Sequence, residues 1–267
     1  MNPEQVAAEI YDQTVPDWPG EMDFYGAAAR GAVSILEIAC GTGRVALRLA
    51  AEGRQVFGFD LSPHAIELAR RKSGGVPAVR WAVADMRSFS LGEMFDLVIV
   101  PGHSFQFMLG IAEQLSCLGS IQRHLTPGGR LVLHIDNQDL SWLGSLPVEA
   151  EGAFGVAQEL GLPEGRRLQI SKRWSYDPAT QTASLITLYE ELDRQGRVTD
   201  CALRGPLRMH CFFRTEMEHL LSRAGLQLHA LYGDFSRAPL GPTSSEMIWV
   251  AGRPAATHSQ ATAGLQP

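Results

Sequence analysis

The chain has 267 residues, of which 45% are hydrophobic and 19% are charged, and its formal net charge is −6. This length and composition are typical of one globular domain, or of one domain with a sizeable insertion. The negative charge argues against a nucleic-acid partner bound over a broad face, and no apolar stretch approaches the roughly 18 residues of a membrane span.

Cysteine usage and the N-terminal composition bear on the compartment. Cys40, Cys117, Cys201 and Cys211 form no C-x-x-C pair and no metal-ligand spacing with histidine. Scattered cysteines are typical of reduced thiols, and residues 1–5 lack the basic and apolar run of a signal peptide. We therefore expect a cytoplasmic protein with no membrane partner and no bound metal.

Residues 1–32 predict an N-terminal helical lid, made of two helices on either side of a proline-containing loop. Tyr11, Trp18 and Tyr25 stand in this segment. Their rings are candidates for covering a bound cofactor. Packing of the helices onto the core is the alternative role for the same rings.

Residues 33–140 predict a Rossmann-like core, because apolar strand patterns alternate with helical patterns, as in parallel sheets with crossover helices. Ser62 followed by Pro63 is a typical helix start. Strands are expected at 34–39, 55–59, 79–83, 95–100 and 130–135, and helices at 43–52, 63–72, 87–90 and 111–125.

The composition changes after residue 140. Alternating apolar and polar residues predict an inserted antiparallel β cover for a substrate over 141–210. Residues 211–253 predict the C-terminal part of the core sheet, and 254–267 predict a disordered tail. Within these segments we expect strands at 167–176, 182–193, 197–210, 226–233 and 246–252, and a helix at 215–224.

Residues 35–44 are the most informative run of the sequence. They predict a buried strand that carries Glu37, then a turn through Gly41 and Gly43, then a helix. A buried acid is costly unless a cation or hydrogen-bond donor meets it, and glycines let the backbone approach a ligand closely. Asp60 ends the next strand, where a carboxylate can accept ribose hydroxyls. The same spacing also fits a dinucleotide fingerprint, so an NAD(P)-dependent oxidoreductase is a second hypothesis.

Four motifs in order, with a fifth segment after them, resemble the class I S-adenosylmethionine (SAM)-dependent methyltransferases of the bacterial small-molecule type. The resemblance implies an α/β fold with a seven-stranded, mostly parallel sheet whose last strand is antiparallel. It also implies SAM as cofactor and inline methyl transfer to O, N or C of a small molecule. The matching segments are 36–43, 56–62, 84–86, 95–99 and 125–131.

The resemblance also assigns cofactor contacts. Asp85 would accept the adenine amino group, which an NAD enzyme does not need, and we expect Glu37, Asp60 and Asp85 to converge at one rim. Together the expected cofactor contacts are Glu37, Ala39, Gly41, Gly43, Asp60, Leu61, Asp85, Met86 and Pro101, with Tyr11, Trp18 and Tyr25 from the lid.

On the acceptor side, His103 follows the fourth strand, where related enzymes often have asparagine. Its ordinary pKa suits proton removal near neutrality, so it is a candidate catalytic base, with a substrate contact or no role as alternatives. A protein that holds SAM without transferring methyl groups is a third hypothesis, and a homodimer is one expected assembly. Other candidate substrate contacts are Phe105, Arg173, Arg208 and His210.

Overall fold

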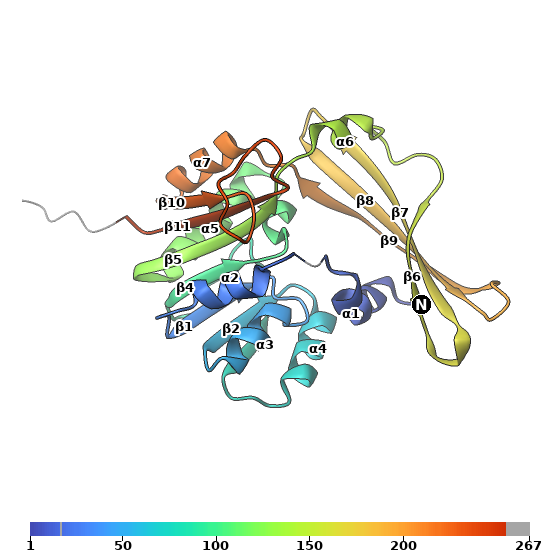
Figure 1. Ribbon diagram of the computed structural model, residues 1–267, viewed down its shortest axis with the longest axis horizontal. Coiled ribbons are helices and arrows are strands. Elements are labelled where there is room, and N and C mark those ends of the chain that lie inside the picture. The colour runs from blue at the N-terminus through green and yellow to red at the C-terminus, as the bar shows by residue number, and fades with distance from the viewer. Residues whose placement is uncertain (17, 255–267) are drawn as a thin grey trace, which may run out of the picture.

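The computed structural model describes residues 1–16 and 18–254, so the predicted tail lies, from residue 255 on, outside the described residues. Two sheets stand beside each other in this part of the chain, one of seven strands and one of four (Figure 1). None of the helices described is long and apolar enough to cross a membrane.

The seven-stranded sheet has the order β10-β11-β5-β4-β1-β2-β3. The five strands β1 to β5 pair in parallel with their neighbours among themselves. Strand β11 is antiparallel to both β5 and β10. The predicted fold class is therefore confirmed. The strands are β1 (Ser34–Ile38), β2 (Gln55–Asp60), β3 (Val79–Val83), β4 (Phe95–Val100), β5 (Leu125–Asp136), β10 (Gln227–Tyr232) and β11 (Glu246–Gly252).

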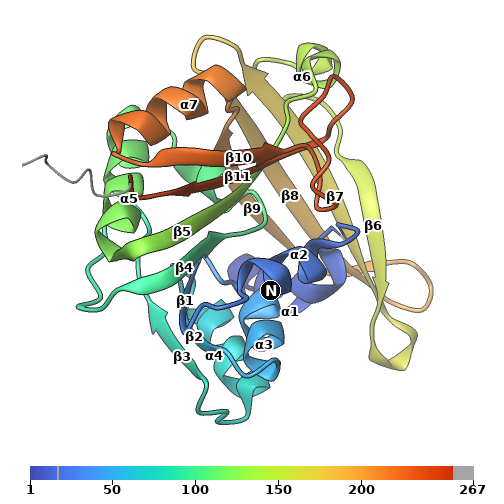
Figure 2. The ribbon, with the colours of Figure 1, turned by 60° about the vertical axis from the view of Figure 1, so that its left-hand side comes forward.

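Helices cover both faces of this sheet, which explains why its strands are apolar on both sides. Buried side chains of α5 and α7 pack on one face, and those of α2 and α3 on the other (Figure 2). The helices are α1 (Pro3–Thr14), α2 (Glu21–Ala28), α3 (Arg44–Ala51), α4 (Pro63–Ser73), α5 (Ile111–His124), α6 (Leu140–Ser145) and α7 (Arg214–Arg223), with 3₁₀ turns η1 (Ser104–Phe107) and η2 (Pro163–Gly165).

Local capping explains where α4 begins. Ser62 accepts a hydrogen bond of 3.2 Å from the backbone N–H of Ala65, and Pro63 takes the first helical position. The helix predicted at 87–90 is wrong, because that segment is a turn followed by a loop. Asp85 explains this: its side chain bonds the backbone of Arg87 and closes a local turn in place of a helical one.

The inserted segment forms the four-stranded antiparallel sheet, in the order β6-β7-β8-β9. Three of its strands match the predicted segments, and β6 was not predicted. Helix α1 lies against this sheet, where Ile10 packs with Leu168, Ile170 and Tyr189. The strands are β6 (Gly155–Gly161), β7 (Arg167–Asp177), β8 (Thr182–Leu192) and β9 (Val198–His210).

Candidate active site

At two positions of the turn between β1 and α3, the backbone has a left-handed conformation that only glycine adopts without strain. Gly41 has φ 55° and Gly43 has φ 84°. A Cβ on Gly43 would lie 2.5 Å from Cη2 of Trp81. Ala39, before the turn, also has a left-handed φ of 55°. The chain is thus shaped to bring its backbone close to a ligand at the carboxyl edge of the sheet.

Glu37 lies beneath this turn and is 1% exposed. Its Oε2 atom has no hydrogen-bond partner among the described residues. Burial, opposed by a hydrogen bond from the backbone of Ala46, raises the pKa of Glu37 to about 8. A buried carboxylate oxygen without a partner is costly, so the site favours a ligand that brings a cation or a donor.

Asp60, at the end of β2, is tied to the same turn. Its Oδ2 accepts a 2.8 Å hydrogen bond from the Gly41 N–H, and its Oδ1 accepts one of 2.8 Å from the Ser62 N–H. Burial nevertheless raises the pKa of Asp60, with these backbone donors acting in the opposite direction. Two of the three predicted acids therefore meet at one rim.

The third acid, Asp85, is turned onto Arg87. The Arg87 Nε donates to Asp85 Oδ2 at 2.8 Å, and the same ion pair lowers the pKa of Asp85. The expected convergence of three carboxylates is therefore not what the structure has, and the adenine contact of Asp85 stays a prediction. Its neighbour Met86 is buried, and Leu61 after β2 is exposed.

Tyr11 of the N-terminal segment lies over the glycine turn, and the role of this segment as a lid stays a prediction. The Tyr11 ring lies 3.6 Å from where a Cβ on Gly41 would be, and its hydroxyl lies 3.8 Å from the corresponding point on Gly102. Tyr11 thus bridges the glycine turn and the end of β4. Asp12 accepts a 2.6 Å hydrogen bond from the Thr42 hydroxyl and pairs with Lys72 of α4.

Two predicted contacts, Tyr25 and Phe105, have their rings in the apolar core, which corrects the expected position of the rings and leaves any ligand contact a prediction. Tyr25 is fully buried and packs edge-on against Phe24 and Phe235, so it holds α2 to the sheet. Phe105 is fully buried and stacks on Phe212 at 5.2 Å between ring centroids. Both corrections have one cause: a large apolar ring gains more from burial than from a place at a wet cleft.

His103 lies at the carboxyl end of β4, just after the buried Pro101, and has a left-handed φ of 64°. Its Nε2 lies 2.7 Å from Oε2 of Glu246 and 3.2 Å from Nε2 of His134. His134 Nε2 lies 2.7 Å from the same carboxylate oxygen. Trp18 completes the group, because its Nε1 donates to Glu246 Oε1 at 3.1 Å.

Two acidic residues near His103, Glu246 and Asp136, were not predicted as site residues from the sequence. Asp136 ends β5 and is paired directly with Glu246, the first residue of β11. Burial raises the pKa of Asp136, and His103 acts to lower it. Topology could have revealed both residues: an antiparallel last strand begins where the parallel strands end, so its first side chain reaches the same edge.

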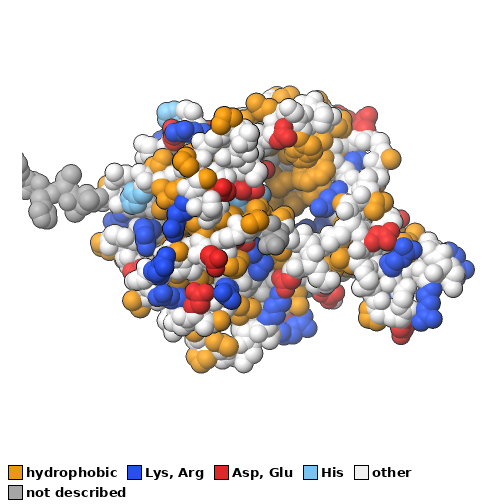
Figure 3. Space-filling model, viewed as in Figure 1, with side chains coloured by type: hydrophobic (Ala, Val, Ile, Leu, Met, Phe, Trp, Pro, Cys, Tyr) orange, Lys and Arg blue, Asp and Glu red, His pale blue; other side chains and the backbone are white. Residues whose placement is uncertain are grey.

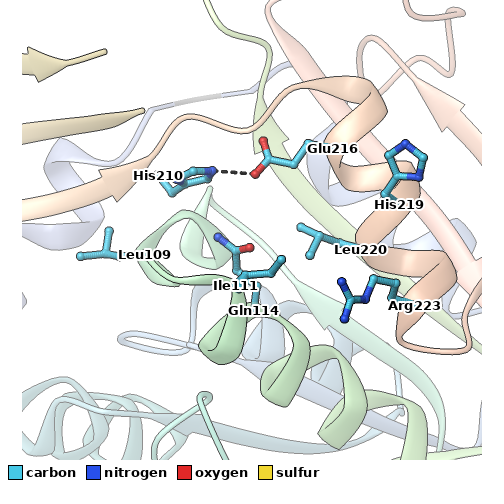
Figure 4. Close-up of a pocket in the computed structure, with 8 residues that line it drawn as sticks. All are labelled: Leu109, Ile111, Gln114, His210, Glu216, His219, Leu220 and Arg223. Atoms are coloured by element: carbon cyan, nitrogen blue, oxygen red, sulfur yellow. Dashed lines mark hydrogen bonds and ion pairs between the residues drawn. The ribbon is translucent and has the colours of Figure 1, made fainter. Parts of the chain in front are cut away.

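The substrate contacts predicted in the inserted sheet lie elsewhere. Arg173 and Arg208 occupy positions of β7 and β9 that alternate with the residues packed on α1 and α6, so they share the far face. His210 turns to Glu216 of α7 at 2.8 Å (Figure 4). Strand alternation and a local ion pair direct the three side chains away from His103, so the structure does not bring them to that site, and their contact with a substrate stays a prediction.

The pocket that His210 lines is distinct from the His103 cluster. It has a volume of about 280 Å³ and lies between α5 and α7 (Figure 4). On the side of α1 and α6, a hollow with a largely hydrophobic floor separates the core from the inserted sheet (Figure 3). In the inserted segment, the Trp142 ring packs edge-on against the Trp174 ring with 5.3 Å between centroids.

Comparison with known proteins identifies the class. A family model described as a methyltransferase domain matches residues 35–129. The chain is 35% identical over 206 residues to dTDP-3-amino-3,6-dideoxy-alpha-D-glucopyranose N,N-dimethyltransferase of Streptomyces fradiae, covering 76% of this chain and 73% of that one. It is 27% identical over 222 residues to the cypemycin N-terminal methyltransferase of a Streptomyces species, covering 82% and 83%.

The fold is also similar to that of a solved methyltransferase structure. The CcbJ methyltransferase from Streptomyces caelestis superposes with a TM-score of 0.71 at 24% identity, over 92% of this chain and 96% of that one. The chain belongs to the class I SAM-dependent methyltransferases. It is an enzyme that uses SAM and methylates a small molecule, so the oxidoreductase hypothesis is wrong, and the comparisons do not support a SAM-binding protein without activity.

The residues present fit SAM. The orphaned Oε2 of the buried Glu37 provides an acceptor for a cationic group, and the left-handed backbone at Gly41 and Gly43 turns the chain at the carboxyl edge of the sheet beside it. Asp60 stands beside them with a carboxylate suited to hydroxyl donors. Phosphate would bring negative charge to two acidic side chains, whereas the cationic amino group and sulfonium of SAM would favour their ionised forms.

Proposed function

We propose that this enzyme transfers methyl groups from SAM to an amino nitrogen of a small molecule. The observation that supports this acceptor is the contact of His103 with Glu246 at 2.7 Å, together with Asp136, the direct strand partner of Glu246, whose pKa His103 acts to lower. Carboxylates stabilise an ammonium group, and that group must lose a proton before its nitrogen can attack. Histidine is suited to take the proton near neutral pH.

The residues divide the work as follows. Asp136 binds the acceptor's ammonium group, and His103 removes a proton from it, which frees the nitrogen lone pair. SAM, when bound, supplies the methyl group, and its sulfur keeps the electron pair of the broken carbon–sulfur bond. Alignment of nucleophile, methyl and sulfur contributes roughly 7–11 kcal/mol at best, and a base adds on the order of a hundredfold or more.

The cofactor contacts belong to the proposal as well. Glu37 and Asp60 bind the methionine amino group and the ribose, with the backbone at Gly41 and Gly43 close to the ligand. Tyr11 and the lid exclude water above them. The inserted sheet and its hydrophobic hollow enclose the body of the acceptor.

The names of two relatives favour nitrogen over oxygen or carbon. One is an amino-sugar N,N-dimethyltransferase, and the other is an N-terminal methyltransferase. We infer an amino sugar as the acceptor class to test first, and a small molecule rather than nucleic acid, given the net charge of −6. We also propose a cytoplasmic location, which is in keeping with Cys40, Cys117 and Cys211 as buried free thiols. A homodimer is the assembly that we propose.

The decisive experiment uses a matched pair of acceptors. The purified enzyme is incubated with SAM and either dTDP-3-amino-3,6-dideoxyglucose or the same sugar nucleotide with a 3-hydroxyl group, and products are followed by mass spectrometry. We expect methylation of the amine alone, and the same preference for amines over alcohols across other small acceptors. Methylation of hydroxyl acceptors while amines stay unmodified would overturn the proposal.

A further inference from the structure

Glu246 is the residue on which three side chains of the active site converge. Its carboxylate is 12% exposed and lies within 2.7 Å of Nε2 of both His103 and His134. Its other oxygen accepts from the Trp18 indole at 3.1 Å. Although burial acts to raise it, the hydrogen bonds from the two histidines lower the pKa of Glu246 to about 2. Glu246 is therefore a carboxylate that only accepts hydrogen bonds.

The backbone fixes the proton on His134. The Gly102 N–H donates to His134 Nδ1 at 3.3 Å, so this nitrogen is an acceptor and Nε2 carries the hydrogen. That Nε2–H points at Glu246 Oε2. Burial lowers the pKa of His134 to about 4, so the ring is neutral at neutral pH. His134 is thus a fixed donor that occupies one side of the carboxylate oxygen.

His103 then has one arrangement compatible with its neighbours. Its Nε2 faces Glu246 Oε2 at 2.7 Å and faces the His134 Nε2–H at 3.2 Å. An unprotonated Nε2 would direct its lone pair at a carboxylate, and such a contact is repulsive. The His103 Nε2 therefore carries its hydrogen and donates it to Glu246, which leaves Nδ1 as the lone-pair acceptor of the ring.

The backbone at His103 supports the same assignment. A left-handed φ of 64° is strained for a non-glycine residue, and such strain clusters at functional sites. Here the strained turn places the ring between Trp18 and His134, with centroids 5.2 and 4.5 Å away. The strain orients the imidazole ring at the carboxyl edge of the sheet.

We propose that Glu246 is a positioning residue that holds His103 in its Nε2–H tautomer and stabilises the imidazolium formed when Nδ1 takes the acceptor's proton. This inference rests on the proposed function. In the proton transfer, the N–H bond of the acceptor's ammonium breaks, a bond from Nδ1 to that proton forms, and the nitrogen keeps the electron pair. Glu246 stays ionised throughout, as a hydrogen-bond acceptor for the positively charged ring.

The same three ligand atoms lie within 4.8 Å of one another, a spacing that a metal ion could also occupy. Binding of a metal at His134 Nε2 would require that nitrogen to give up the hydrogen that the Gly102 N–H assigns to it. The hydrogen-bond directions therefore favour a proton network, and metal binding becomes one outcome of the test.

The experiment compares wild type, Glu246→Gln and Glu216→Gln. Glu216 is a matched control, because it pairs with His210 at 2.8 Å outside the active site. Histidine ¹⁵N NMR spectra, with resonances assigned from His103→Asn and His134→Asn, report the tautomer of each ring without any acceptor. Methyl transfer to the amine acceptor gives kcat and KM, and calorimetry gives the SAM affinity.

We expect His103 in the Nε2–H tautomer in wild type and in Glu216→Gln, and a mixture of tautomers in Glu246→Gln. Only Glu246→Gln should lose kcat, by about a hundredfold, with SAM affinity unchanged. An Nδ1–H tautomer in wild type, or unchanged spectra and kcat in Glu246→Gln, would overturn the inference. So would loss of activity in EDTA that Zn²⁺ restores. Absence of amine methylation by wild type would instead reject the proposed function, and the spectra would still locate the proton.

Discussion

Asp12 and Thr42 join the N-terminal helix to the glycine turn through a hydrogen bond of 2.6 Å. Lys72 of α4 pairs with the second carboxylate oxygen of Asp12. The preceding residue, Tyr11, lies over the turn. Because α1 also packs on the inserted sheet through Ile10, this one helix contacts both walls of the cleft. Access to the cofactor site therefore depends on how firmly α1 is held.

The first prediction concerns this attachment. Asp12→Ala removes the acceptor for Thr42 and Lys72, and a hydrogen bond to a charged group contributes about 1.5–3 kcal/mol. We expect SAM to bind at least about tenfold more weakly, which corresponds to about 1.4 kcal/mol. Calorimetry measures the affinity, and limited proteolysis should cut α1 faster. Glu9→Ala, which changes an exposed residue of the same helix, is the control, and equal effects in both variants would contradict the prediction.

The second prediction concerns proton release at Glu37. Its pKa of about 8 means that the carboxyl group is mostly protonated at pH 7 without ligand. A cationic group brought next to Oε2 favours the carboxylate, so SAM binding should release up to about one proton. Titration calorimetry in two buffers of different ionisation enthalpy measures the released protons. Glu37→Gln should abolish this proton release. An equal release of protons by the variant would contradict the assignment of the released proton to Glu37.

The same residue predicts how stability depends on pH. Burial raises the pKa of Glu37 from the ordinary 4.5 of a glutamate to about 8, so between these values the folded chain holds a proton that the unfolded chain has lost. Stability from this group is therefore present below pH 4.5 and is lost as the pH rises towards 8. Ligand-free wild type should lose more stability than Glu37→Gln between about pH 5.5 and 8.5 by denaturant unfolding. Parallel curves for the two proteins would contradict this.

The fourth prediction concerns Gly43 and the shape of the glycine turn. Gly43→Ala forces a left-handed φ and places a methyl group 2.5 Å from the Trp81 ring. Gly53→Ala, at φ 83°, meets no atom within 4 Å and so isolates the cost of the backbone alone. We expect Gly53→Ala to cost about 1 kcal/mol and Gly43→Ala about 1–3 kcal/mol more in urea unfolding. Equal losses of unfolding free energy in the two variants would show that the Trp81 ring moves aside without cost, which would contradict the prediction.

The sequence predicted the parallel strands well for a physical reason. A strand buried on both faces is a nearly continuous apolar run, and the runs that became β1 and β4 are of this kind. The runs at 55–59, 79–83 and 95–100 also stand between clear helix and turn signals. Strand β6 escaped prediction because it is an edge strand with mostly exposed side chains and little alternation. The helix expected at 87–90 failed because local side-chain bonds from Asp85 favour a turn.

The two halves of the site differ in the same way. The places of Glu37, Gly41 and Asp60 were predictable because each lies within a few residues of the end of a strand, so local sequence fixes its place. Glu246 lies 143 residues from His103, and its role depends on an antiparallel pairing that brings the start of β11 to the carboxyl edge of the sheet. Side chains joined only by such long-range pairing leave no local pattern in the sequence.

The last prediction separates acceptor binding from cofactor binding. Asp136 is the carboxylate proposed to hold the acceptor's ammonium group, and it is not in contact with the glycine turn. Asp136→Asn keeps the side-chain shape but removes the charge, so KM for the amine acceptor should rise about tenfold or more, since a charged hydrogen bond contributes about 1.5–3 kcal/mol. SAM affinity should stay as in wild type. Asp23→Asn, at an exposed position of α2, controls for the loss of one negative charge. A KM unchanged in Asp136→Asn would place the ammonium group elsewhere, with Glu246 as the remaining carboxylate beside His103.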